Sequence, residues 1–294
     1  MNAAIRALLG EVIDYAGMFP PAALALEPAI RNYARYVTSE DRWMLGRFIC
    51  PANKLSELSP FVDELFSSGE PLRISALGRG GKTREEFDAG MRLDADSVRQ
   101  FSARHPDRAM IDVFETRSPP NPKIPLETST FVEANITGSN WRNAISDMID
   151  AAELRQFGFK LRTGGVEASA FPPAEQIAFA ITACRDARVP IKFTAGLHHP
   201  IRHMNATING KMHGFINVFV AGVLAHVHRL NEAKLIPILN DEKSENFRFD
   251  KDGLRYNDLR VSVDHIESAR RQLISFGSCS FDEPREDLRR LGWL

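Results

Sequence analysis

The stretch GFKLRTGG (158–165) is followed, after one helix's length of chain, by PIKFTAGLHHP (190–200). Each of these segments is a short apolar run that contains one lysine, Lys160 or Lys192, and then passes into small residues and glycine. Short apolar runs separated by helical patterns are typical of buried parallel strands joined by crossover helices. This unit of strand, helix and strand therefore indicates an α/β fold with two lysines on successive strands.

The same alternation of apolar run and helical pattern recurs eight times along the chain. Such strands form a parallel sheet with right-handed crossovers, and eight units predict a closed (β/α)8 barrel of the TIM type. An open doubly wound sheet would show the same alternation, so the number of units decides between the two folds. We expect a single domain over residues 1–294, with strands at 12–19, 44–50, 72–78, 109–115, 129–135, 157–163, 191–197 and 273–279.

The chain between the seventh and eighth expected strands, residues 200–270, is too long for a simple loop and helix. It contains an apolar helical pattern at 215–228, a short run at 235–239 that could form an extra strand, and a polar segment at 240–258. We therefore predict an elaborated connection here, which is also a candidate lid.

Local signals mark two helix starts. Thr83 and Glu86 have the spacing of a capping box, and Pro172 and Pro173 precede a long helical pattern. Cys184 falls on the apolar face of that second pattern, which predicts a thiol packed in the core.

The composition excludes several classes of protein. The 37 basic and 38 acidic residues balance and form no block of like charge, so nothing indicates nucleic acid or an anionic membrane surface as a partner. The start of the chain is too interrupted by charge for a signal peptide, and no apolar stretch approaches the roughly 20 residues that span a bilayer. Three widely spaced cysteines form no disulfide framework. We expect a soluble, cytoplasmic protein that binds a small molecule, and homo-oligomer formation stays open.

The two strand lysines carry the main functional hypothesis. A lysine in an apolar strand is costly to bury as a cation, so it usually has a chemical task or a carboxylate partner. A second cation close by lowers the pKa of an amine, as a nucleophilic lysine requires. Three interpretations remain: a nucleophilic amine, a structural ion pair with Asp112 or Glu133, and a positive charge that binds substrate.

In a barrel, the active site lies at the carboxyl ends of the strands, so polar residues there are the candidates. Period-two alternation places Lys160 with Arg162, and Lys192 with Thr194, on the same face of their strands. The resulting cationic site suits a small anionic or carbonyl compound. The expected catalytic residues are Lys160, Lys192, Asp112 and Glu133. The expected substrate-binding residues are Arg162, Arg47, Thr194, Ser278, Ser280, His198 and His199.

A cluster of histidines supports a different chemistry. His198, His199, His203 and His213 lie close together in the sequence, and Glu115 or Glu133 could complete a site for Zn²⁺ or Fe²⁺, with His198, His199, His203 and Glu115 as the expected ligands. General acid–base work or anion binding on a loop would use the same side chains. Cys279 could act as a nucleophile, but no histidine lies near it in sequence, so a reduced core thiol is the default interpretation.

At these residues the chain resembles the class I, Schiff-base aldolases of the deoxyribose-phosphate aldolase type. Asp112 in MIDVFE is similar to the family's strand-four aspartate, and Lys160 in FKLRTGG to its Schiff-base lysine. Lys192 in IKFTAG is similar to the family's second lysine, and FGSCS to its phosphate loop. The resemblance implies a barrel enzyme that needs no cofactor and uses Lys160 as the imine-forming residue. The chain departs from the family at residues 197–200, LHHP, where the family has a glycine-rich turn.

The whole chain also resembles a group of uncharacterised bacterial proteins that share DYAGMFPPA, TAGLHHP and FGSCSFDEP. That resemblance implies a shared fold and no particular activity. Three hypotheses follow: a carbon–carbon lyase acting through a lysine imine, a zinc- or iron-dependent hydrolase or lyase, and a barrel that binds a small molecule without catalysis.

Overall fold

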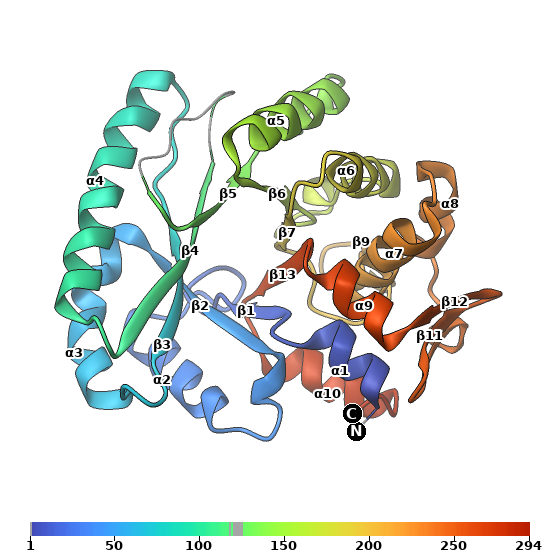
Figure 1. The fold of residues 1–294 in the computed structure, drawn as a ribbon, viewed down its shortest axis with the longest axis horizontal. Coiled ribbons are helices and arrows are strands. Elements are labelled where there is room, and N and C mark those ends of the chain that lie inside the picture. Colours follow the sequence, from blue (N-terminus) through green and yellow to red (C-terminus); the bar gives the residue numbers. More distant parts are fainter. Residues whose placement is uncertain (1, 118, 120–125) are drawn as a thin grey trace.

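The computed structural model describes residues 2–117, 119 and 126–294. Eight parallel strands close a barrel in the order β1-β2-β3-β4-β5-β6-β7-β13, with β13 pairing back to β1, and helices surround it (Figure 1). This confirms the predicted (β/α)8 architecture. The barrel strands are β1 (Ile13–Tyr15), β2 (Leu45–Pro51), β3 (Leu72–Leu77), β4 (Ala109–Arg117), β5 (Ser129–Glu133), β6 (Gly158–Arg162), β7 (Ile191–Thr194) and β13 (Leu273–Ser278).

The helices begin where the local sequence provides caps. The Thr83 hydroxyl accepts from the Glu86 N–H while Glu86 reaches back to the cap, so the predicted capping box starts the longest helix. Pro173 is the N-cap of α6, as predicted. The helices are α1 (Ala3–Leu9), α2 (Leu26–Val37), α3 (Leu55–Leu65), α4 (Arg84–Arg104), α5 (Trp141–Arg155), α6 (Ala174–Asp186), α7 (Phe215–His228), α8 (Glu232–Leu239), α9 (Val263–Arg270) and α10 (Asp282–Arg290). Short 3₁₀ turns lie at Arg42–Met44, Ala52–Lys54, Ala168–Ala170 and Ser244–Asn246.

The hydrophobic core lies between the barrel and its helices. Helix α7 is buried on all sides over its first eleven residues, because its sequence is apolar all round. Phe215 at its start stacks on Phe276 of β13, with ring centroids 5.2 Å apart. Cys184 on α6 is buried in the same core, as predicted. In the described part of the chain, no helix has the length and hydropathy of a membrane span.

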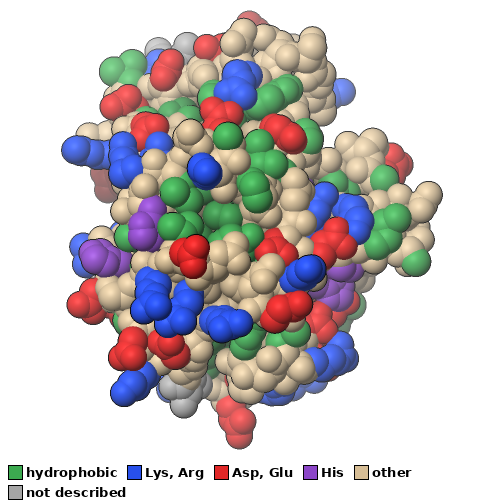
Figure 2. Space-filling model, turned by 90° about the vertical axis from the view of Figure 1, so that its right-hand side faces the viewer, with side chains coloured by type: hydrophobic (Ala, Val, Ile, Leu, Met, Phe, Trp, Pro, Cys, Tyr) green, Lys and Arg blue, Asp and Glu red, His purple; other side chains and the backbone are tan. Residues whose placement is uncertain are grey.

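The connection between β7 and β13 is elaborated, as predicted. It contains a hairpin of β8 (His203–Asn205) and β9 (Gly210–Met212), the helices α7 to α9, and an antiparallel sheet of β10 (Phe247–Phe249), β11 (Gly253–Tyr256) and β12 (Leu259–Ser262). The small sheet packs beside α1 and α9 at the edge of the molecule (Figure 1). Figure 2 views the molecule from that side and shows acidic and basic side chains interspersed over this face.

One local prediction in this connection is wrong. Residues 235–239 are the end of helix α8 and not a strand. Asn231 caps the helix, and Leu235, Ile238 and Leu239 are spaced so that one helical face is buried. The buried Asn217 side chain donates to the carbonyls of Ile238 and Asp241, which fixes the end of α8 against α7.

Candidate active site

A cavity of about 480 Å³ opens at the carboxyl ends of the barrel strands. We call it the mouth cavity. A larger hollow of about 760 Å³ lies at the opposite end, around the starts of β2 and β3. Catalytic residues of such barrels sit at the carboxyl ends, so the mouth cavity is the candidate active site. Its polar lining consists of Glu115, Lys160, Arg162, Glu167, Thr194, His198 and Cys279.

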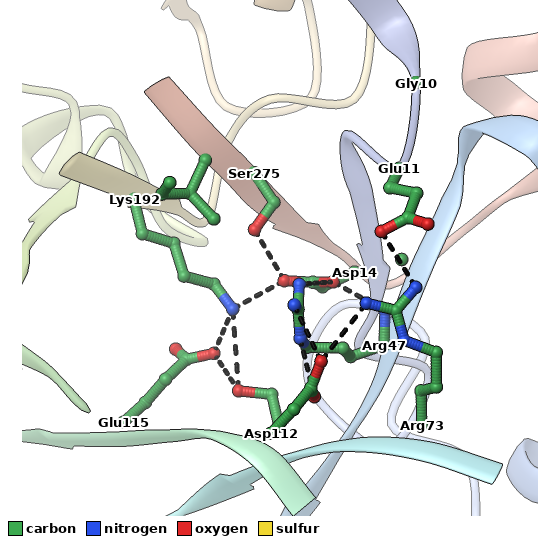
Figure 3. Close-up of polar contacts among 12 residues, drawn as sticks. Gly10, Glu11, Asp14, Arg47, Arg73, Asp112, Glu115, Lys192 and Ser275 are labelled. Carbon is green, nitrogen blue, oxygen red and sulfur yellow. Dashed lines mark hydrogen bonds and ion pairs between the residues drawn. The ribbon is translucent and has the colours of Figure 1, made fainter. Parts of the chain in front are cut away.

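Lys192 lies in the centre of the barrel, below the cavity. Its Nζ is 2.5 Å from Asp14 Oδ2 on β1 and 2.5 Å from Glu115 Oε1 on β4 (Figure 3). Ser75 donates to the same Glu115 oxygen at 2.6 Å, and Ser275 donates to Asp14 at 2.7 Å. Lys192 and Asp14 are completely enclosed. The lysine is therefore a cation fixed by two carboxylates from different strands.

Lys160 lies beside Lys192 in the strand register and reaches the floor of the mouth cavity. Its Nζ is 2.8 Å from Glu115 Oε2 and 3.5 Å from Glu133 Oε2. Glu133 is also contacted by Arg162 at 2.9 Å and by Arg117 at 2.7 Å. Opposite charges therefore alternate from the barrel centre to the mouth, and the two lysines share Glu115.

These contacts determine the charge states of Glu115, Glu133 and Lys192. Burial raises the pKa of Glu115, but Lys160 and Lys192 outweigh burial and hold that pKa far below its usual range. Burial likewise raises the pKa of Glu133, whereas Lys160, Arg162 and Arg117 together lower it to about 2. Burial lowers the pKa of Lys192, but Asp14 and Glu115 outweigh it and leave the pKa above its usual value. Lys192 is therefore a permanent cation at neutral pH.

Acid is expected to destabilise the fold through Glu133. Its folded-state pKa lies below the ordinary 4.5, so its ion pairs contribute fully above that pH and are lost as the pH falls toward 2. The difference corresponds to roughly 3 kcal/mol. The contribution of Glu133 to the free energy of unfolding can be measured by urea unfolding of the wild type and of Glu133→Gln, from about pH 7 down to about pH 2.5. The variant should be less stable than the wild type at neutral pH, and the difference between their free energies of unfolding should become smaller as the pH falls. A difference that stays constant with pH would contradict the lowered pKa of Glu133.

Asp112 and Arg47, predicted to serve the active site, lie instead toward the amino-terminal end of the barrel. Arg47 binds both oxygens of Asp112 at 2.8 Å, and Arg73 adds a third contact at 3.1 Å (Figure 3). Neither Asp112 nor Arg47 lines the mouth cavity. Asp112 precedes Glu115 by three residues, which in a strand is a displacement of roughly 10 Å along the barrel. Glu115 thus occupies the position beside the lysines that we predicted for Asp112.

The loops after β6 and β7 form one wall of the cavity, and their backbones pack closely. The Thr163 hydroxyl donates to the carbonyls of Thr194 at 3.1 Å and Ala195 at 2.6 Å. Ala195 has a φ of 61°, which is costly for a residue with a side chain, and such strain clusters at functional sites. A Cβ on Gly164 would lie 2.8 Å from the Gly196 Cα, so this contact requires glycine. The TGG and TAG motifs therefore fix the wall that holds Lys160, Arg162 and Thr194.

Other predicted substrate-binding residues have local structural roles. Ser278 donates to the carbonyl of Ser280 at 2.7 Å, and the Ser280 hydroxyl accepts from the Glu283 N–H at 3.1 Å. Both serines thus shape the turn into α10 and lie outside the cavity lining. His199 also lies outside it, because its Nδ1 contacts Asp287 at 2.5 Å. Of the predicted substrate-binding set, the cavity brings together Arg162, Thr194 and His198.

The predicted metal ligands are not brought to one point. His199 and His203 face each other at 4.4 Å between ring centroids, beside a separate hollow. His198 turns into the mouth cavity, and Glu115 is enclosed with the two lysines. Across residues 2–117, 119 and 126–294, no group of three or more His, Cys, Asp or Glu side chains could hold a metal ion. The prediction of a site made of His198, His199, His203 and Glu115 is therefore corrected.

The structure also shows where the candidate lid, residues 200–270, lies relative to the mouth cavity. The described lining of the mouth cavity includes no residue from 200–270. The β8–β9 hairpin approaches the loop after β6, where a Cβ on Gly210 would lie 3.1 Å from Ala168 Cβ. The connection thus supports one loop of the mouth from outside.

The expected catalytic and substrate-binding residues leave out two members of the central cluster. Asp14 and Ser75 are fully buried polar residues in otherwise apolar strands. Gly46 leaves room for Asp14, because a Cβ there would collide with its Oδ1. A polar residue at an inward position of a short apolar strand is the signal that could have found both.

The fold and the site define a TIM-type barrel with a lysine–carboxylate cluster beneath its carboxyl-terminal mouth. Comparison with known proteins yields no relative: no family model, no curated protein and no solved structure matches the chain. The function is therefore argued from the geometry of the site.

Proposed function

We propose that this protein is a carbon–carbon lyase of the aldolase type that acts on a small anionic carbonyl compound through an imine on Lys160. One observation carries the proposal. Among the described residues that line the mouth cavity, Lys160 is the single lysine, and its Nζ lies between the carboxylates of Glu115 and Glu133. Lys192 is enclosed below and paired on two sides, which supports Lys160 as the nucleophile.

The two carboxylates supply the proton transfers that imine chemistry requires. The Lys160 ammonium gives its proton to solvent, and the free amine, held between the two carboxylates, attacks the substrate carbonyl carbon. The carbonyl electron pair moves to oxygen, which is protonated and leaves as water. A carboxylate then takes the proton of the β-hydroxyl, the carbon–carbon bond breaks, and its electron pair moves to the iminium nitrogen. Protonation of the enamine and hydrolysis of the imine return the free lysine.

Lys192 contributes a fixed positive charge to this scheme. It holds one oxygen of Glu115 while Lys160 contacts the other, so Glu115 stays aimed at the reacting nitrogen. Arg162 lies above Lys160 on the same strand face and lines the cavity. Its guanidinium suits a carboxylate or phosphate on the substrate. A volume near 480 Å³ suits a small metabolite.

Borohydride trapping tests the proposal. Each member of a panel of 2-keto acids and aldehydes is incubated with the protein, and borohydride then reduces any imine to a stable amine. Intact-mass measurement should show one adduct for at least one compound, and peptide mapping should place it on Lys160. Exposed Lys211, which pairs with Glu242, serves as the internal control and should stay unmodified.

Absence of an adduct across the panel, or equal labelling of Lys211, would count against the imine. Specific binding of panel compounds without trapping would favour the non-catalytic barrel.

A further inference from the structure

A cysteine and a histidine meet in the wall of the mouth cavity, from loops that follow neighbouring strands. Cys279 follows β13 and His198 follows β7, and these two strands pair in the barrel. The Cys279 Sγ lies 3.9 Å from the His198 Nδ1, and both residues line the cavity. Their separation of about eighty residues hid this pair from the sequence.

Glu283 on α10 contacts the same imidazole. Its Oε2 lies 3.3 Å from the His198 Nδ1. Burial lowers the pKa of His198, but the neighbouring Cys279 and Glu283 outweigh burial and raise it to about 9. The protonated imidazole is thus favoured, as a thiolate partner requires.

The other two cysteines have different surroundings. Cys50 and Cys184 are at most 1% exposed and lie within the hydrophobic core. Burial raises the pKa of Cys50 to about 12 and raises that of Cys184 as well. Cys279 combines access to a cavity with an imidazole neighbour, so its chemistry should differ from theirs.

We infer that Cys279 and His198 form a nucleophilic thiol–imidazole pair in the mouth cavity, suited to a ligand that carries an α,β-unsaturated carbonyl group. This inference does not depend on the imine at Lys160. The Cys279 thiol gives its proton to His198 Nδ1, and the Glu283 carboxylate stabilises the imidazolium. The thiolate sulfur then bonds to the β-carbon of the ligand, and the alkene electron pair moves through the α-carbon to the carbonyl oxygen. The imidazolium proton passes to the α-carbon, which completes the addition.

The test is the rate at which N-ethylmaleimide, an α,β-unsaturated carbonyl compound, modifies each cysteine of the folded protein at neutral pH. Peptide mapping by mass spectrometry resolves the three sites, so Cys50 and Cys184 act as internal controls. We expect Cys279 to react first. His198→Gln should slow its reaction at least about tenfold, because the imidazole that takes the thiol proton is lost.

His199→Gln is the matched control, because it removes an adjacent histidine that contacts Asp287 outside the cavity. This variant should leave the rate at Cys279 within about twofold of wild type. Equal rates at Cys279 in the wild type and His198→Gln would overturn the inference, and so would equal labelling of all three cysteines. If His198→Gln does not fold, ultraviolet absorbance of the thiolate decides: the wild type should exceed Cys279→Ser at neutral pH, and equal absorbance overturns the pair.

The modification does not require Lys160. Loss of imine trapping with retained labelling of Cys279 would therefore count against the lyase proposal alone. Retained trapping with an unreactive Cys279 would count against the thiol–imidazole pair alone.

Discussion

Replacing Lys192 by methionine is expected to lower the free energy of unfolding by roughly 3 to 5 kcal/mol. Methionine has a similar length, so the change removes a charge and leaves the space filled. Asp14 and Glu115 would each lose a contact of 2.5 Å in a fully enclosed part of the barrel. Asp14 would keep Ser275 and the Arg47 backbone N–H as close donors, but its remaining cation, the Arg47 guanidinium, lies 3.9 Å away. Removing one partner of a buried ion pair is costly for this reason.

Urea unfolding at neutral pH measures this loss, and the exposed pair of Lys211 and Glu242 provides the control. Lys211→Met should cost no more than about 1 kcal/mol, because both side chains are over 40% exposed. The double variant Lys192→Met with Asp14→Asn should recover part of the loss, because it removes one of the two carboxylate charges that lose Lys192 as a partner. A loss below about 1 kcal/mol in Lys192→Met would show that the central ion pairs do not hold the barrel together.

Replacing Lys160 by methionine is expected to abolish borohydride trapping and to reduce turnover roughly a thousandfold or more. The cost in stability should be smaller than for Lys192, roughly 1 to 3 kcal/mol. Glu115 keeps Lys192, and Glu133 keeps Arg162 and Arg117, so neither carboxylate is left without a cation. The two lysines are paired in the strand register and share one carboxylate. We nevertheless expect replacement of Lys160 to affect mainly the chemistry and replacement of Lys192 to affect mainly the stability.

Lys160→Arg is the matched control for this second prediction. Arginine keeps the positive charge beside Glu115 and Glu133 but forms no imine under these conditions, so the variant should be stable and inactive. Circular dichroism and urea unfolding would verify that both variants are folded. Undiminished trapping in folded Lys160→Met would place the imine elsewhere and contradict the proposed function.

The sequence predicts much of this fold because local patterns encode it. Short apolar runs alternate with capped helical patterns, and eight such units close a barrel. Period-two alternation also predicts that Lys160, Arg162 and Thr194 face the same interior, and all three line the mouth cavity. The run at 235–239 was misassigned because a short apolar segment has no clear period, and helix α8 forms there through its cap and its packing.

The tertiary structure decides which charges meet. Asp112 and Glu115 lie on the same strand, yet only Glu115 reaches the lysines, while Asp112 pairs with two arginines at the opposite end. The height of a side chain along the barrel axis depends on the stagger between strands. Period-two alternation predicts which face a side chain points to, but it does not predict this stagger.

The sequence by itself determined the strand–helix order, the inward-facing lysines and the elaborated connection before β13. Only the tertiary structure decided that Lys192 is enclosed while Lys160 reaches the cavity, and that Cys279 meets His198. The physical reason is that strand pattern and capping are encoded by residues a few positions apart. Ion pairs and thiol–imidazole contacts depend on side chains from different strands, whose relative heights are fixed only when the barrel closes.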